Sequence, residues 1–204
     1  MNTALHIQEI PVTGSLMRIP FHSYKSPKAK LERSVDDNSI IRLRRNLYLK
    51  LDGNVANNFL VANYILSPSY VTGVTALSYY GLIPEYVCDT ISFTTKKTVS
   101  YNNVIGHFTY RFCNPDYFFI GINHPIVLRH QVALASPEKA LCDHILMTPN
   151  LNLRYVKETI EWLEQDMRMD LDMLSDMDLS IIQQCARYSQ KTHTLNNIIR
   201  ILHD

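Results

Sequence analysis

The first clear pattern of apolar and polar positions predicts a helix over residues 27–36. Leu31 and Val35 stand four residues apart, so they share one face of a helix. Ser26 can accept a hydrogen bond from the first free amides, and Pro27 loses no hydrogen bond at the first helical position. The basic residues of this segment would then lie outside the buried stripe: Lys28, Lys30 and Arg33.

A two-stranded hairpin is predicted directly after this helix. In residues 40–44 apolar positions alternate with arginines, and in residues 47–51 leucines alternate with Tyr48 and Lys50, the period of two that half-buried strands have. Asn46 tolerates the positive φ that a tight hairpin turn requires. A helix followed by a hairpin with an arginine-rich tip is the second half of a winged helix-turn-helix, in which the helix enters the major groove and the wing contacts phosphates.

Two interpretations of this basic segment stay open. It can bind DNA, or it can be a structural hairpin whose exposed Lys and Arg only keep the surface solvated. Upstream of Tyr24, Gly14 and Pro20 interrupt the supporting helix that a full helix-turn-helix needs, so we expect an abbreviated unit. A unit of ~50 residues also buries too little surface to be very stable alone. It is therefore expected to pack on the rest of the chain.

The remaining pattern predicts an α+β fold with a winged-helix domain at residues 1–52 and a mixed domain at residues 53–204. Apolar stretches and caps predict helices at 73–80 and 137–147 and a helical C-terminus after residue 155. Residues 59–66, apolar nearly all round, are predicted as a buried helix, with a strand as the less favoured alternative. Alternating stretches predict strands at 90–95, 106–112, 117–121 and 126–133. We expect a small, mostly antiparallel sheet with helices on one side.

Composition and charge indicate where the protein is located and how its charge is distributed along the chain. Hydrophobic residues make up 46% of the chain and charged residues 19%, an ordinary globular balance. No apolar run reaches the ~18–20 residues of a membrane span, no secretory signal is visible, and the four cysteines form no CxxC pair, so a cytoplasmic protein with reduced thiols is expected. Residues 1–51 carry nine Lys or Arg and four Asp or Glu, whereas residues 161–204 carry four and eight. A basic head on an acidic tail is typical of a chain whose one end meets a polyanion.

Candidate chemistry is sparse. The eight histidines show no metal-ligand spacing, and no phosphate-binding glycine motif occurs, so we predict no metal, no cofactor and no catalytic residue. Asp143-His144 on a helix could be an acid–base pair, but a structural aspartate beside a partly exposed histidine is the favoured interpretation. An enzyme acting on nucleotides or RNA would need a deep cleft around Lys96, Lys139 and Asp143. Lys96 and Lys97 at a strand end could instead bind a phosphate or an RNA backbone, as an antitoxic surface.

Six short motifs occur in order along residues 40–143. They are IRLRRNLY at 41–48, FLVANY at 59–64, PSYV at 68–71, ALSYYGLIPE at 76–85, TTKK at 94–97 and ASPEKAL at 135–141. Together they resemble the AbiEi family, the antitoxins of abortive-infection (type IV) toxin–antitoxin systems. Many members of that family carry glycine after the recognition helix and at the wing turn, where this chain has Asn38 and Asn46, the next best residues for a positive φ.

The resemblance implies a non-enzymatic protein with two activities. Its winged helix-turn-helix would bind inverted repeats upstream of its own operon, with a dimer expected on DNA, and repress it. The rest of the chain would counteract a nucleotidyltransferase-type toxin without needing a stable complex. The predicted DNA-binding residues are Lys25, Ser26, Lys28, Lys30, Arg33, Arg42, Arg44, Arg45, Asn46 and Lys50. The alternative is a protein-interaction module that binds a toxin or partner through its amphipathic C-terminal helices and does not bind DNA.

Overall fold

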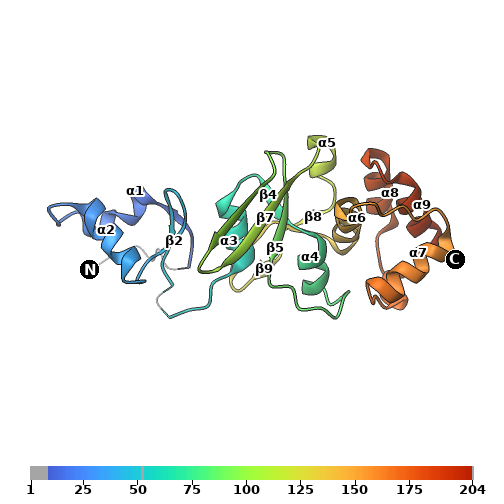
Figure 1. Cartoon of the computed structure of the whole chain (residues 1–204), viewed down its shortest axis with the longest axis horizontal. Helices are drawn as coiled ribbons and strands as arrows, with labels where there is room; N and C mark the ends of the chain where they lie inside the picture. Colours follow the sequence, from blue (N-terminus) through green and yellow to red (C-terminus); the bar gives the residue numbers. More distant parts are fainter. Residues whose placement is uncertain (1–8, 52, 204) are drawn as a thin grey trace.

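The computed structural model describes residues 9–51 and 53–203 and has the predicted α+β class. Three parts follow one another along the long axis of the molecule: a small N-terminal unit, a central sheet with its helices, and a group of C-terminal helices (Figure 1). The main hydrophobic core runs from the N-terminal unit through the central sheet into the C-terminal helices.

The N-terminal unit is an abbreviated winged-helix arrangement. Its elements are β1 (Val12–Thr13), α1 (Gly14–Met17), a 3₁₀ turn η1 (Ile19–Phe21), α2 (Pro27–Asp36), β2 (Ile41–Arg44) and β3 (Leu47–Leu49). The predicted helix and its cap are confirmed, because the Ser26 hydroxyl accepts a hydrogen bond from the Ala29 amide at 3.4 Å. The predicted hairpin is confirmed with shorter strands. The supporting helix is a single turn, and β1, which was not predicted, adds a third strand in the order β1-β3-β2.

This three-stranded sheet is covered on both faces. Leu47 and Leu49 belong to the main core, whereas Ile40 and Tyr48 pack with Leu31 of α2 in a smaller second core. Tyr48 lies on the face opposite the leucines, as the period of two predicted, and α2 covers that face. The hairpin of residues 41–49, called the wing below, is therefore shared between the N-terminal unit and the body of the protein.

A β-bulge in the wing turns two neighbouring arginines to opposite faces. Arg42 pairs with Tyr48 and Arg44 pairs with Leu47, so the register shifts between them. An extra residue in one strand leaves two residues opposite one, which breaks the strict alternation of sides. Arg42 consequently faces α2, whereas Arg44 faces the body, and the two do not share one surface as the period of two had predicted.

The central sheet is mixed, with six strands in the order β6-β7-β5-β4-β11-β8. Three of its pairings are antiparallel, and the β5–β7 and β4–β11 pairings are parallel. The strands are β4 (Ser69–Val71), β5 (Thr90–Thr94), β6 (Val99–Asn103), β7 (Gly106–Phe112), β8 (Ile122–Asn123) and β11 (Leu134–Ala135). Strands β5 and β7 match the predictions for residues 90–95 and 106–112.

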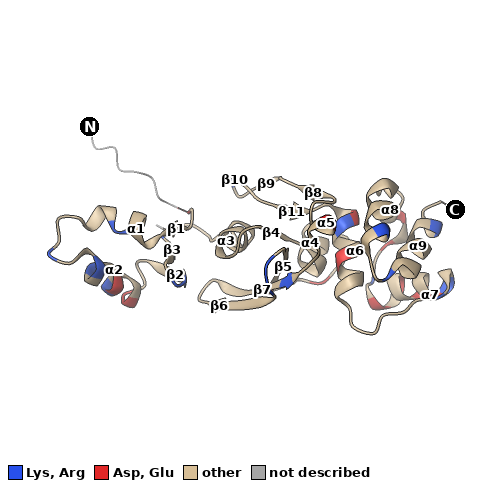
Figure 2. Cartoon of the chain, turned by 90° about the horizontal axis from the view of Figure 1, so that it is seen from above, with Lys and Arg blue, Asp and Glu red and all other residues tan. Residues whose placement is uncertain are grey.

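Helices cover both faces of this sheet. The predicted helices are confirmed as α3 (Asn58–Ile65), α4 (Gly73–Tyr79) and α6 (Pro137–Met147). The Tyr110 hydroxyl of β7 donates to the Ala62 carbonyl of α3 at 2.6 Å, whereas the Tyr70 hydroxyl of β4 donates to Asp143 of α6 at 2.9 Å. Figures 1 and 2 show α3 on one side of the sheet and α4 and α6 on the other. The expectation of helices on one side was therefore wrong.

Two predicted strands have other structures. Residues 117–121 overlap a short helix, α5 (Pro115–Phe118), whose start is marked by Asn114, a residue that accepts a hydrogen bond from the Asp116 amide. Residues 126–133 form a small hairpin of β9 (Ile126–Val127) and β10 (His130–Gln131), because Leu128 and Arg129 adopt positive φ values that end a strand.

The C-terminus is helical, as predicted. It consists of α7 (Val156–Glu161), a π-turn η2 (Trp162–Asp166), a 3₁₀ turn η3 (Leu171–Leu174), α8 (Leu179–Tyr188) and α9 (Thr192–Ile201). Within the described residues, no helix has the length and apolar character needed to cross a membrane.

Candidate nucleic-acid interface

A groove of about 430 Å³ lies between α2 and the wing. Lys28 and Glu32 of α2 form one wall, Arg42 and Arg45 of the wing form the other, and Arg18, which follows α1, completes it. These four cations around one carboxylate define what is called the basic groove below. Arg18 was missed by the sequence analysis, because it stands alone in a stretch whose helix could not be placed. Figure 2 shows the basic positions along α2 and β2 in this unit.

Glu32, the one carboxylate among the described residues of the groove, is engaged by Arg42. The Arg42 guanidinium forms an ion pair with Glu32 and lies over the Tyr48 ring, 5.7 Å from the ring centroid. Both charged side chains are about 40% exposed, at 41% and 43%. An ion pair this exposed contributes little stability, so a phosphate oxygen can replace the Glu32 carboxylate at small cost. Arg42 is thereby held over the groove by a partner that it can exchange.

The tip of the wing is fixed by a contact with α1. Asn46 has the predicted positive φ, 61°, and its side-chain oxygen accepts a hydrogen bond from the Gly14 amide at 3.2 Å. A Cβ atom on Gly14 would lie 2.7 Å from that oxygen, so only glycine allows this approach. We had predicted that Asn46 binds DNA. The structure shows a different use of its side chain, which holds the exposed Arg45 next to the groove.

The predicted DNA-binding residues therefore separate into two groups. One group consists of exposed cations on α2, before it, or at the wing tip: Lys25, Lys28, Arg33 and Arg45. Others have internal contacts. The Ser26 hydroxyl caps α2, Lys30 lies 5.8 Å from the ring centroid of Tyr24, and Lys50 follows β3 in a half-buried position.

Arg44 links the wing to the body of the protein through hydrogen bonds. Its Nε donates to the Ile65 carbonyl at the end of α3 at 2.6 Å, and its Nη1 donates to the Arg45 carbonyl at 3.2 Å. The Ile65 side chain is fully buried. A guanidinium that is held against a helix end in this way is turned away from the basic groove, so we remove Arg44 from the proposed DNA-contacting residues.

The two lysines predicted as an antitoxic surface do not line the basic groove. Lys96 and Lys97 lie in the turn between β5 and β6, on the central sheet, and both are exposed. The Lys96 ammonium donates to the Ser67 carbonyl at 2.5 Å. Lys96 is thus partly committed to the protein, and Lys97 is the more accessible of the two cations.

Asp143 and its neighbours form a sealed polar cluster in the core. The carboxylate accepts hydrogen bonds from the hydroxyls of Tyr70 at 2.9 Å, Thr72 at 2.7 Å and Tyr117 at 2.6 Å, and forms an ion pair with Lys139 at 3.3 Å. The Lys139 and Asp143 side chains have no exposed surface. Burial, followed by the nearby Asp143 charge, raises the pKa of both Tyr70 and Tyr117 well above the ordinary value, so these hydroxyls stay protonated donors.

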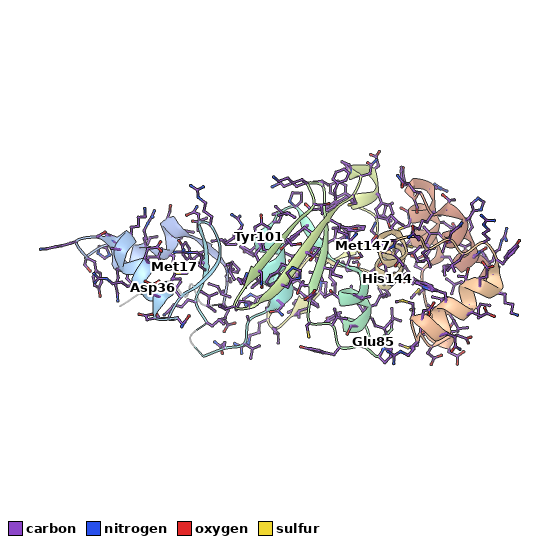
Figure 3. The ribbon with its side chains drawn as sticks, viewed as in Figure 1. Met17, Asp36, Glu85, Tyr101, His144 and Met147 are labelled. Carbon is purple, nitrogen blue, oxygen red and sulfur yellow. The ribbon has the colours of Figure 1, made fainter. Side chains whose placement is uncertain are left out.

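His144 does not cooperate with Asp143. Its ring stacks on Trp162 with centroids 5.9 Å apart, and Figure 3 shows it between α6 and the C-terminal helices. Burial lowers the pKa of His144, because a neutral imidazole is preferred there. The structure thus supports the structural interpretation of Asp143-His144 over the acid–base one. Among the described residues, no group of His, Cys, Asp and Glu is arranged to hold a metal ion.

Comparisons with known proteins place the fold only. No family model matches the chain, and no curated protein sequence matches it. The crystal structure of the Rv2827c protein from Mycobacterium tuberculosis is similar over 95% of this chain and 76% of that one, with a TM-score of 0.53 and 11% sequence identity. At that identity the likeness supports the α+β architecture and carries no information on function.

Proposed function

We propose that this protein is a DNA-binding regulator whose N-terminal winged unit contacts the duplex through the basic groove. The observation that carries the proposal is the convergence of Arg18, Lys28, Arg42 and Arg45 around one groove at the exposed side of α2. Phosphate contacts by Lys and Arg position a protein on DNA, while residues of the inserted helix read base edges. Lys28 lies in the first turn of α2, where the helix dipole also favours an anion.

The resemblance to the AbiEi family motivates the rest of the proposal. The regulator would repress its own operon by binding inverted repeats upstream of it, as a dimer, and would counteract a nucleotidyltransferase-type toxin. The motifs that carry this resemblance extend well beyond the N-terminal unit, to residue 141. We therefore assign DNA contact to the N-terminal unit and antitoxicity to the remainder of the chain, with no enzymatic step.

The first experiment measures binding of the full chain to DNA from upstream of its gene by fluorescence anisotropy, between 50 and 200 mM salt. If the winged unit neutralises about five phosphates, the log–log salt slope is about −4.5 and affinity falls roughly 500-fold over this range. Unrelated duplexes of equal length measure the nonspecific contribution. Equal affinity for upstream and unrelated DNA would contradict a regulator that recognises its own operator.

A paired substitution tests the groove itself. Lys28→Ala with Arg45→Ala is expected to reduce the salt slope by about 2, because two phosphate contacts are lost. The matched control is Arg154→Ala with Arg200→Ala, which removes two exposed cations from the C-terminal part. Thermal unfolding of both variants should equal that of the parent. An unchanged slope in the groove variant would show that DNA, if bound, is bound elsewhere.

Antitoxicity is tested by co-expression with a nucleotidyltransferase-type toxin encoded next to this gene. The parent is expected to restore growth, and the Lys28→Ala, Arg45→Ala variant is expected to restore it equally while losing repression of the operon. Loss of both properties together would contradict the assignment of the two activities to separate parts. Failure of the parent to restore growth would overturn the antitoxin role and leave the DNA-binding role to be judged on its own measurements.

The alternative, a protein-interaction module built on the C-terminal helices, has less structural support. The apolar stripes that suggested it are used internally, since Ile182 and Cys185 of α8 and Leu195 and Ile198 of α9 are fully buried. Helix α8 packs on α9 and on α6, and α9 also packs on α7. A stable 1:1 complex with the toxin in light scattering, together with no affinity for upstream DNA, would favour this alternative.

A further inference from the structure

A second cavity, of about 460 Å³, lies where the central sheet meets the C-terminal helices. It opens at the carboxyl ends of the parallel strands β5 and β7, beside α5 and the end of α6 (Figure 1). Its far wall is the connection between α8 and α9. Met147, labelled in Figure 3, lies between the sheet and the C-terminal helices and forms part of its apolar wall. We call this cavity the aromatic pocket.

The walls of the aromatic pocket combine ring faces with positive charge. Phe112 at the end of β7 and Tyr188 at the end of α8 line it and are 56% and 55% exposed, although both are large apolar rings. Phe93 and Tyr117 line it from the buried side. The charged side chains among the described lining residues are cations alone, Arg111 and Lys191.

The shape of the pocket is fixed before any ligand arrives. Met147 packs against Gly73, which has a φ of +58°, and a Cβ atom there would lie 2.5 Å from the Met147 methyl group. The Lys191 ammonium donates to the carbonyls of Ile145 at 2.8 Å and of Thr148, near the end of α6. An ammonium group has three donors, so these two contacts anchor it and leave one for a ligand. The Phe112 amide is held by the Thr98 hydroxyl at 3.1 Å.

We propose that the aromatic pocket binds a planar aromatic ligand that carries an anionic group, the chemistry of a nucleotide. Its volume lies within the roughly 300–1,000 Å³ of small-molecule sites. Exposed aromatic rings next to cations are what such a ligand needs, since rings stack on bases and Arg binds phosphate by paired hydrogen bonds. Arg111 has the planar fork for the anion, and Phe112 and Tyr188 offer ring faces.

The pocket borders the turn that follows Lys96 and Lys97. From the sequence, these lysines could bind a phosphate or an RNA backbone. The next residue, Thr98, lines the pocket, whereas neither lysine is among its described lining residues. A bare phosphate would use the cations and leave the rings solvated. An apolar ligand would leave Arg111 and Lys191 without a counter-charge. The combination favours a ligand that satisfies both.

Isothermal titration calorimetry of the full chain tests the proposal with AMP, adenosine and ribose 5-phosphate. AMP has ring and anion, whereas the other two compounds have only one of these groups. We expect AMP to bind at least tenfold more tightly than either. Equal affinity for AMP and ribose 5-phosphate would show that the ring does not contribute to binding. Equal affinity for AMP and adenosine would show that the anionic group does not. Either result, or no binding of AMP at millimolar concentration, overturns the proposal.

Single substitutions locate the binding. Arg111→Gln and Tyr188→Ala are each expected to weaken AMP binding roughly tenfold, since the first removes a charge-assisted contact and the second a stacking ring. Both side chains are exposed, so the fold should persist, and an unchanged thermal midpoint verifies this. The control is Arg187→Gln, an exposed cation one residue before Tyr188 that does not line the pocket. Unchanged binding in Arg111→Gln and Tyr188→Ala places AMP elsewhere and overturns the proposal.

The same chemistry can come from a free nucleotide or from single-stranded nucleic acid. An eight-nucleotide RNA is therefore titrated alongside AMP. If the RNA binds more tightly than AMP, and Arg111→Gln weakens both to the same extent, the pocket binds single-stranded nucleic acid. RNA binding that only the Lys28→Ala, Arg45→Ala variant weakens belongs to the basic groove. Because the groove variant is expected to bind AMP like the parent, failure of this proposal is distinguishable from failure of DNA binding.

Discussion

Two ion pairs in this molecule have the same chemistry and opposite surroundings. Arg42–Glu32 bridges the wing and α2 with both side chains about 40% exposed, whereas Lys139–Asp143 lies within α6 with neither side chain exposed. In the first pair water can replace either partner. In the second, each charge depends on the other. The Asp143 carboxylate also accepts hydrogen bonds from the hydroxyls of Tyr70, Thr72 and Tyr117, and the Lys139 ammonium donates to a backbone carbonyl. The exposed pair is suited to exchange partners with a ligand, and the buried pair to hold strands and helices in place.

The buried pair should show the largest effect. Asp143→Asn leaves the Lys139 ammonium in the core without a counter-charge, and removing one partner of a buried pair typically costs about 3–5 kcal/mol. We expect the free energy of unfolding, measured by urea denaturation, to fall by that amount. Asp176→Asn, at an exposed position, serves as the control. Recovery of stability in the double variant Asp143→Asn, Lys139→Met would show that the stranded charge is the cause. A loss below about 1 kcal/mol would contradict the comparison.

Arg44 offers an intermediate case, a half-buried cation bonded to backbone. Arg44→Met keeps the aliphatic stem and removes the hydrogen bond to the Ile65 carbonyl, so we expect a loss of about 1–2 kcal/mol in urea denaturation. Affinity for upstream DNA should stay within about twofold of the parent, because Arg44 faces the body. A large loss of DNA affinity with unchanged stability would restore Arg44 to the DNA-contacting residues.

His144 tests how burial acts on a group that titrates. Burial lowers its pKa below the ordinary 6.5, so the unfolded chain binds the proton more readily than the folded chain does. The contribution of His144 to the free energy of unfolding should therefore be complete above about pH 6.5, and it should be lost as the pH falls toward the folded pKa. His144→Phe, which can keep the ring contact with Trp162, is expected to flatten this dependence in urea titrations from pH 7.5 to 5. An unchanged slope would mean that other groups produce it.

The exposed pair should show the smallest effect on stability and a visible effect on binding. Glu32→Gln removes the carboxylate from the basic groove, and an exposed pair of this kind contributes below about 0.5 kcal/mol. We expect no measurable change in unfolding and a few-fold gain in DNA affinity at low salt, which should disappear as salt screens the groove. Reduced affinity would instead indicate that Glu32 orients Arg42 productively.

Local signals in the sequence were sufficient for the elements with caps. Ser26, Asn57 and Ser136 each accept a hydrogen bond from the first turn of α2, α3 and α6, and such contacts depend only on residues a few positions apart. The turn at Asn46 follows from its tolerance of positive φ in the same way. The helix α5 could have been found from Asn114-Pro115, but its aromatic residues outweighed that signal and predicted a strand.

Short strands and the exact grouping of the cations could not be predicted, because they depend on distant partners. Strand β4 has three residues and β11 two, and each is held by strands far away in the sequence. The separation of Arg42 from Arg44 arises from a bulge, which is a property of the register between two strands and not of either strand. The aromatic pocket likewise draws on segments from residue 93 to residue 191.

The wing buried on both faces has a mechanical consequence. A reading unit joined by a flexible linker can swivel and accept operator half-sites at many separations, but here Leu47, Leu49 and the Arg44–Ile65 contact fasten the unit to α3. In a dimer on DNA, the separation of the two half-sites would therefore be set by how two bodies associate. Inserting or deleting single base pairs between the inverted repeats should abolish cooperative binding, because rotating one half-site by about 35° per base pair cannot be absorbed within the chain.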